Sequence, residues 1–186
     1  GFEEDSPLKD PVQEFEEFKR ANVDGMVRSA AMQDLTWQWF LESYRHKYSY
    51  NFTWLGRPII QYPQDILAVQ ELVWKVRPDL IVETGIAHGG SLVLHASLLE
   101  MAGGEGRVVG IDIDIRPHNR AAIESHPMAR RIDMIEGSSV DPGVVADVSR
   151  LAKGRRKVMV VLDSNHTHAH VLEELKARCD AVVVGI

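Results

Sequence analysis

The fold is decided by the stretch Leu80-Ile81-Val82-Glu83-Thr84-Gly85-Ile86-Ala87-His88-Gly89-Gly90-Ser91. Its apolar start predicts a buried strand, and its three glycines allow a sharp turn in which the backbone comes close to a ligand. Residues 91–102 predict a helix, with Ser91 as its N-cap and Gly103-Gly104 just past its end. A helix that begins here points its N-terminus at whatever the turn binds.

Strands and helices alternate on both sides of this stretch. Helices are predicted at residues 64–76, 117–126, 142–153 and from the end of the fourth strand to about 178. Further strands are predicted at residues 107–112, 132–136, 157–163 and 181–184. These strands lack polar alternation, which implies burial on both faces, and the helical crossovers imply parallel pairing. The sequence therefore predicts an α/β fold with a doubly wound, mostly parallel sheet.

The N-terminal part has a different character. Residues 1–10 predict a loose arm, and residues 12–24 and 26–46 predict two helices separated by Gly25. We therefore expect a helical extension or cap at residues 1–55 and the sheet domain at 56–186. Eight of the thirteen aromatic residues lie between Trp37 and Trp54. They could pack helices together, or they could form a substrate cap or the face of a homo-oligomer.

Composition excludes several classes of function. The net charge of −6 argues against broad attraction to nucleic acid or an anionic membrane. No apolar run is long enough to span a bilayer, and the acidic N-terminus does not resemble a signal peptide. The single cysteine, Cys179, cannot form an internal disulfide, so we expect a reducing cytoplasm.

An acidic residue, Glu83, precedes the first glycine of the turn. The glycine spacing also differs from the Gly-x-Gly-x-x-Gly pattern of dehydrogenases, and a carboxylate here would repel a diphosphate. NAD is therefore disfavoured. A cationic group would be attracted, and the ammonium and sulfonium groups of S-adenosylmethionine (SAM) fit that requirement.

Other polar residues follow the next two predicted strands. Asp112 ends the second strand, where a carboxylate can bind ribose hydroxyls, although Asp114 could take that role instead. Ser138 follows the third strand and could reach an adenine. Ligands of open α/β sheets bind at the carboxyl ends of the strands, so these residues and the glycine turn predict one site.

The most reactive sequence follows the fourth strand, Asp163-Ser164-Asn165-His166-Thr167-His168-Ala169-His170. Its alternate histidines suggest a zinc cluster, but alternate residues point apart on a helix, which this stretch begins. Asp163 and His166 lie three residues apart at the turn and can reach one centre. A carboxylate there can hold Mg²⁺, and a neighbouring histidine can accept a proton near neutral pH.

Four ordered motifs closely resemble the cephalosporin hydroxylase family, which itself resembles class I SAM-dependent methyltransferases with a Rossmann-like fold. The motifs are residues 82–91, 110–116, 135–139 and 162–168, and the resemblance runs from about Gly56 to the end. The family includes rhamnosyl O-methyltransferases and is related to macrocin and mycinamicin O-methyltransferases of natural product biosynthesis. The resemblance implies that this protein is a SAM-dependent transferase that methylates a hydroxyl of a sugar or glycosylated metabolite.

The resemblance also implies roles for residues after the fourth strand. In these relatives an Asp-x-x-His sequence supplies a Mg²⁺ ligand and the general base, and Asp163 and His166 match it. The remaining acidic ligands come as a Glu-Asp pair after the fifth strand, beyond Ile186, so we expect further C-terminal strands to complete the site.

Two other functions stay open at this stage. The family name suggests a cephalosporin hydroxylase, although the sequence lacks a recognisable facial triad of two histidines and a carboxylate. A SAM-binding or assembly protein without catalysis is the second alternative. Consumption of O2 with an oxidised co-substrate would support the former, and absence of the acidic pair from the full-length protein would support the latter.

Overall fold

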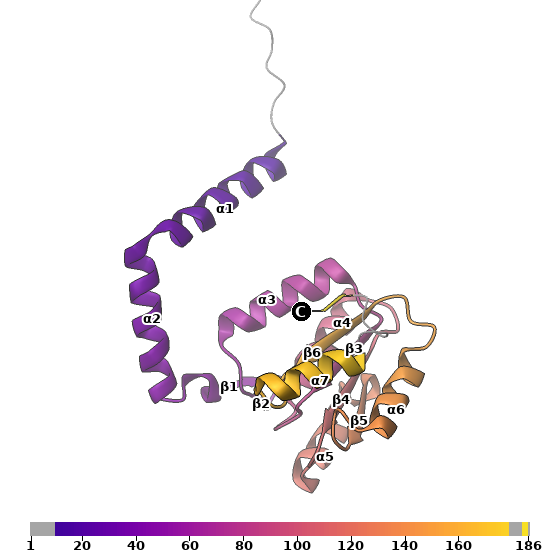
Figure 1. Cartoon of the computed structure of the whole chain (residues 1–186). Helices are drawn as coiled ribbons and strands as arrows, with labels where there is room; N and C mark the ends of the chain where they lie inside the picture. The colour runs from indigo at the N-terminus through magenta and orange to yellow at the C-terminus, as the bar shows by residue number, and fades with distance from the viewer. Residues whose placement is uncertain (1–9, 179–183, 186) are drawn as a thin grey trace, which may run out of the picture. The chain divides into compact units, whose positions relative to one another are not determined.

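The computed structural model describes residues 10–178 and 184–185 and divides into two compact units, Gly1–Tyr48 and Ser49–Ile186 (Figure 1). Residues 49–55, which we expected in the helical arm, thus fall in the larger unit. The predictions for residues 1–9, for Cys179 and for strand residues 181–183 lie outside the described part of the chain. No helix within the described part is long and apolar enough to cross a membrane.

Residues 10–48 of the smaller unit contain the helices α1 (Pro11–Arg28) and α2 (Ala30–Arg45). The predicted break at Gly25 is wrong, because α1 continues through this residue and the chain turns at Ser29. Ser29 is extended and its hydroxyl accepts a hydrogen bond from the Met32 amide at 3.3 Å, so a serine cap sets the boundary. Exposed aromatic rings remain on α2, among them Trp37 and Phe40, whose centroids stack 5.7 Å apart.

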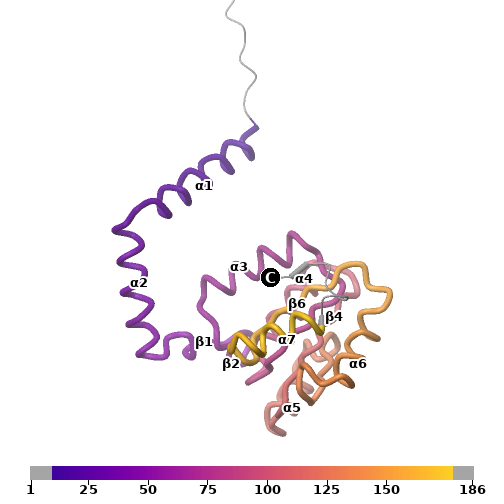
Figure 2. The backbone as a smooth tube through the Cα atoms, in the orientation of Figure 1, coloured from indigo at the N-terminus to yellow at the C-terminus, as the bar shows by residue number. Residues whose placement is uncertain are grey.

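The short helix η1 (Tyr48–Asn51) spans the boundary between the two units, and all but its first residue belong to the larger one. The strands of the larger unit are β1 (Phe52–Trp54), β2 (Arg57–Ile59), β3 (Leu80–Thr84), β4 (Arg107–Asp112), β5 (Ile132–Glu136), β6 (Val158–Leu162) and β7 (Val184–Gly185). Its other helices are α3 (Pro63–Val76), α4 (Gly90–Ala102), α5 (Pro117–Glu124), η2 (Ala129–Arg131), α6 (Pro142–Ala152) and α7 (His168–Arg178). Figure 2 traces their path.

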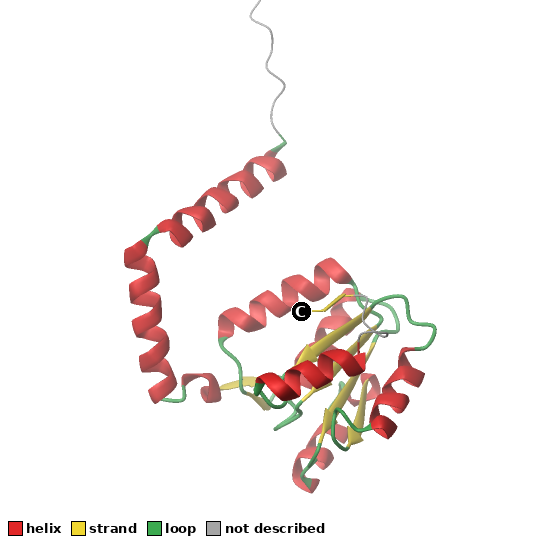
Figure 3. Cartoon of the chain, viewed as in Figure 1, coloured by secondary structure: helices red, strands yellow, loops and turns green. Residues whose placement is uncertain are grey.

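The main sheet has the strand order β5-β4-β3-β6-β7, and every described pair is parallel. Helices cover both faces (Figure 3). Ile81 of β3 faces a core formed with α3, α4 and α5, whereas Leu80 and Val82 face a core formed with Val144 and Val148 of α6. The prediction of a doubly wound parallel sheet is therefore confirmed.

The start of α4 differs from the prediction. Gly89 is the N-cap, with φ of 80°, and Ser91 lies one residue inside the helix. The glycine takes a left-handed conformation that a serine would adopt only with strain. Because Gly89 has no side chain with which to cap the helix, the first-turn amides receive no side-chain acceptor from the cap residue.

The hairpin of β1 and β2 was not predicted. Its turn residues Leu55 and Gly56 both have positive φ, and leucine is not a residue that marks such turns in a sequence. Phe52, Trp54 and Ile59 pack against the core on the α4 side, and the Trp54 indole donates to the Ser97 hydroxyl of α4 at 3.0 Å. The hairpin is thus fixed to the helix that follows the glycine turn.

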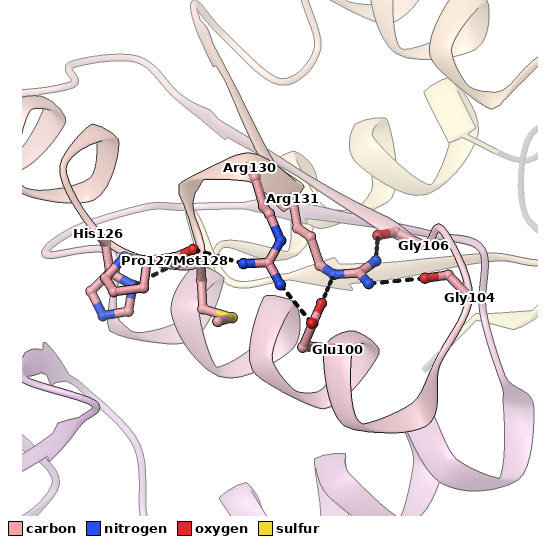
Figure 4. A network of polar contacts seen from close by, with 8 residues as sticks. All are labelled: Glu100, Gly104, Gly106, His126, Pro127, Met128, Arg130 and Arg131. Carbon is pink, nitrogen blue, oxygen red and sulfur yellow. Dashed lines mark hydrogen bonds and ion pairs between the residues drawn. The ribbon is translucent and has the colours of Figure 1, made fainter.

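A polar network holds the opposite end of the sheet (Figure 4). Arg130 and Arg131 both pair with Glu100 near the end of α4, and hydrogen bonds from Arg131 keep the pKa of Glu100 below its usual range. Arg131 also donates to the carbonyls of Gly104 and Gly106 at 2.9 and 2.7 Å. These contacts connect α4 to the segment that leads into β5.

The hairpin depends on a glycine at position 90. A Cβ placed there would lie 2.2 Å from the Pro58 carbonyl oxygen and 2.7 Å from Ile59 Cβ. Gly90→Ala must therefore push β2 away from α4 and should lower the free energy of unfolding by roughly 3 kcal/mol, measured in urea. Gly25→Ala is the control, because nothing lies within 4 Å of its new Cβ and alanine favours helix. Equal urea midpoints for Gly90→Ala and wild type would contradict the close approach.

Candidate active site

A cavity of about 500 Å³ opens at the carboxyl ends of β3, β4, β5 and β6. The β2 strand and the segment after it, together with Tyr50, supply further lining residues. Eight of the ten site residues predicted from the sequence line this cavity: Gly85, His88, Gly90, Ser91, Asp112, Ser138, Asp163 and His166. The parallel sheet thus brings together residues that are up to 81 positions apart (166 − 85) in the chain.

The two remaining predicted residues, Glu83 and Gly89, do not line the cavity. Gly89 instead allows the turn to pack closely against α5. Its backbone is left-handed, and a Cβ at this position would lie only 2.4 Å from Ile123. Gly85 has φ of 93°, and a Cβ there would lie 2.2 Å from the Asp163 carbonyl oxygen. The loop after β3 is therefore pressed directly against the backbone that carries Asp163.

Asp112 shapes the glycine loop. One of its carboxylate oxygens accepts hydrogen bonds from the Ile86 and Ala87 amides at 2.7 and 3.3 Å, and the other accepts from the Asp114 amide at 3.2 Å. Asp114 itself is exposed and does not line the cavity. Of the two acids between which the sequence could not choose, Asp112 is the one that faces the cavity.

Glu83 is buried beneath the cavity, with only 1% of its surface exposed. Its carboxylate lies 3.1 Å from Nδ1 of His95 on α4, which is also buried. No sequence pattern indicates this partner, because the two residues lie on different elements. Glu83 acts on the cavity through its charge, because it raises the pKa of Asp163.

Asp163 lies at the centre of the reactive end of the site. Burial, and then the charge of Glu83, raise its pKa to about 6, although His166 and His95 act in the opposite direction. Its two oxygens face His166 Nε2 at 3.7 Å and the Gln61 amide at 3.4 Å. Asp163 and His166 therefore meet as the sequence predicted.

One histidine on the cavity wall was not predicted. His170 was not among the predicted site residues, but it lines the cavity, and its Nε2 lies 3.2 Å from the Ser139 hydroxyl and 3.4 Å from Glu174. Glu174 is fully buried and accepts a hydrogen bond from Ser164 at 2.8 Å. Burial alone would raise the pKa of Glu174, but hydrogen bonds from hydroxyl groups such as Ser139 and Ser164 hold it below the usual range.

Solved structures identify the fold, and a family profile identifies the family. The fold matches that of CmcI: two CmcI structures, one with Mg and SAM and one with SAH, superpose with TM-scores of 0.54 and 0.52. They are 22% and 21% identical and cover 73% and 72% of this chain, and 54% and 61% of the CmcI chains. The profile of the rhamnosyl O-methyltransferase/CmcI family matches residues 46–185. This chain belongs to that family, which confirms the resemblance of its motifs.

Sequence relatives agree with this assignment. The rhamnosyl O-methyltransferase of Mycobacterium tuberculosis H37Rv is 30% identical over 144 residues, which is 73% of this chain and 56% of that protein. The rhamnosyl O-methyltransferase of Mycobacterium leprae is 29% identical over 143 residues, covering 73% and 59%. The chain thus spans somewhat more than half the length of these relatives.

The buried Glu83–His95 pair generates one prediction. His95→Ala leaves the Glu83 carboxylate buried without its partner, so the free energy of unfolding should fall by ~3–5 kcal/mol in urea at pH 7. The control is His118→Ala, an exposed histidine on α5. Similar losses from both substitutions would show that the pair contributes little.

Asp163 generates a second prediction, on pH dependence. Because its folded pKa of about 6 exceeds the ordinary 3.8, the folded state holds the proton more tightly, and stability from this group is lost as pH rises from about 4 to about 6. Asp163→Asn removes that loss. The variant should therefore gain stability relative to wild type across this window and keep the gain at pH 8, measured by urea unfolding without added metal. A constant difference between pH 4 and pH 8 would contradict the assignment.

Proposed function

We propose that the protein is a SAM-dependent O-methyltransferase that transfers the methyl group to a hydroxyl of a sugar or a glycosylated natural product. One observation carries this proposal: the glycine loop and Asp112 share a single cavity with Asp163 and His166. A cofactor held by the first pair would place its reacting carbon beside the second. The names of the mycobacterial relatives support a sugar hydroxyl as acceptor.

The cofactor-binding part of the proposal uses the loop after β3. The uncapped start of α4 and the lining residues Gly85, Gly90 and Ser91 would receive the methionine portion of SAM. Asp112 would accept hydrogen bonds from the ribose hydroxyls, since a carboxylate has acceptor capacity beyond its three loop amides. Ser138 lines the wall after β5, where an adenine would lie.

The catalytic part uses the turn after β6. His166 would remove the proton of the acceptor hydroxyl, because its imidazole lines the cavity beside Asp163 and histidine is the commonest general base in enzymes. The protein would hold the acceptor oxygen in line with the methyl carbon and the sulfur of SAM.

Asp163 would hold Mg²⁺. Its carboxylate lies on the cavity wall and offers the oxygen ligands that this ion prefers, so the residues present fit part of such a site. The described residues contain no group of three or more His, Cys, Asp or Glu side chains arranged to hold a metal. When bound, the ion would polarise the acceptor hydroxyl and lower its pKa.

The general base is tested in the full-length protein. His166→Ala should lower methyl transfer to a glycosylated acceptor by ~10²–10⁴-fold and leave the dissociation constant of SAM unchanged by calorimetry. His168→Ala is a matched control, because His168 is exposed and does not line the cavity. If His166→Ala retains wild-type turnover while binding SAM, the base lies elsewhere.

A further inference from the structure

The glycine loop contains a strained residue that is not a glycine. Ala87 has φ of 45°, a left-handed conformation that alanine adopts only when its surroundings impose it. It lies between Gly85 and His88, which both line the cavity. Contacts from outside the loop must therefore stabilise this conformation of Ala87.

Two side chains from distant elements hold the carbonyl groups of this turn. Asn119 of α5 donates from Nδ2 to the Ala87 carbonyl oxygen at 2.9 Å. Arg57 of β2 donates from Nε to the His88 carbonyl oxygen at 3.0 Å, and its Nη2 bonds to the same oxygen. Arg57 Nη2 also donates to Asn119 Oδ1 at 3.1 Å, so the two side chains form one unit.

Asn119 anchors this unit in the interior, whereas Arg57 is half-buried. Asn119 is only 4% exposed, and both ends of its amide are used. Loss of the side chain would leave the Ala87 carbonyl without this donor and Arg57 without this acceptor, a costly situation for a buried group. On the amide side, Asp112 accepts from Ile86 and Ala87. The turn is thus held by its amides and by its carbonyls.

We propose that Arg57 and Asn119 are positioning residues for SAM: by holding the carbonyl oxygens of Ala87 and His88, they fix the loop in its binding conformation before the cofactor arrives. The inference rests on the proposed function for the identity of the ligand. Neither Arg57 nor Asn119 lines the cavity, so both act through the loop backbone. A loop that must be ordered by the ligand binds more weakly than one already ordered.

The test combines binding with local stability. The variants are Arg57→Ala, Asn119→Ala and Asn119→Asp, the last of which keeps the acceptor for Arg57 but loses the donor to Ala87. Arg116→Ala and His118→Ala are matched controls, because both residues are exposed on or beside α5 and neither lines the cavity. SAM affinity is measured by calorimetry at a temperature where circular dichroism shows every variant folded, and amide hydrogen exchange is followed by mass spectrometry.

The three variants should weaken SAM binding by at least about tenfold, which corresponds to ~1.4 kcal/mol. Exchange of the loop amides at residues 85–90 should accelerate, whereas exchange in β3 and β4 and the behaviour of both controls should match wild type. A merely structural role would lower the melting temperature and leave the affinity of the folded protein unchanged, and that result overturns the inference.

The two proposals fail in different ways. If the wild-type protein does not bind SAM, the proposed function is wrong, yet the exchange measurement still decides whether Arg57 and Asn119 hold the loop. If wild type binds SAM and the variants bind it within about threefold with unchanged loop exchange, the positioning role is wrong.

Discussion

The contact between the loop after β3 and the backbone after β6 determines the geometry of the whole site. Gly85 lies so close to the Asp163 carbonyl that a single added carbon would overlap it. Because β3 and β6 are neighbours in the sheet, this contact sets the glycine loop directly beside Asp163. The glycine loop and the turn after β6 are therefore parts of one packed unit, and movement of one requires movement of the other.

Because the strands are parallel, the clustering of polar residues at one edge of the sheet can be predicted from the sequence. Once the buried strands are recognised, their carboxyl ends must lie at one edge, and the polar residues that follow them must meet there. The structure agrees, because the polar residues predicted at these ends line one cavity: Asp112, Ser138, Asp163 and His166. The bounds of β4 and β5 also match the prediction.

What the sequence did not reveal depends on contacts between distant segments. The β1–β2 hairpin is built on a turn with an unusual leucine, and Arg57 meets the glycine loop only because that hairpin packs on α4. The Glu83–His95 pair, the His170–Ser139 contact and the hydrogen bond from Asn119 to Ala87 likewise join segments whose mutual orientation has no local signal. The predicted starts of α2 and α4 were wrong for a different reason. Residue type predicts an N-cap only in part, and the backbone conformation places the caps at Ser29 and Gly89.

These long-range contacts explain why the site should favour a positively charged ligand. Glu83 is buried below Asp163, and its charge together with burial makes ionisation of Asp163 costly, as the pKa of about 6 shows. His95 already pairs with Glu83, and its effect on Asp163 is the weakest of the four that act on it. A cation placed in the cavity against Asp163 would favour the ionised carboxylate and recover part of that cost. Glu83 does not line the cavity, so in the proposed function its negative charge would act on the ligand through Asp163 rather than by direct contact.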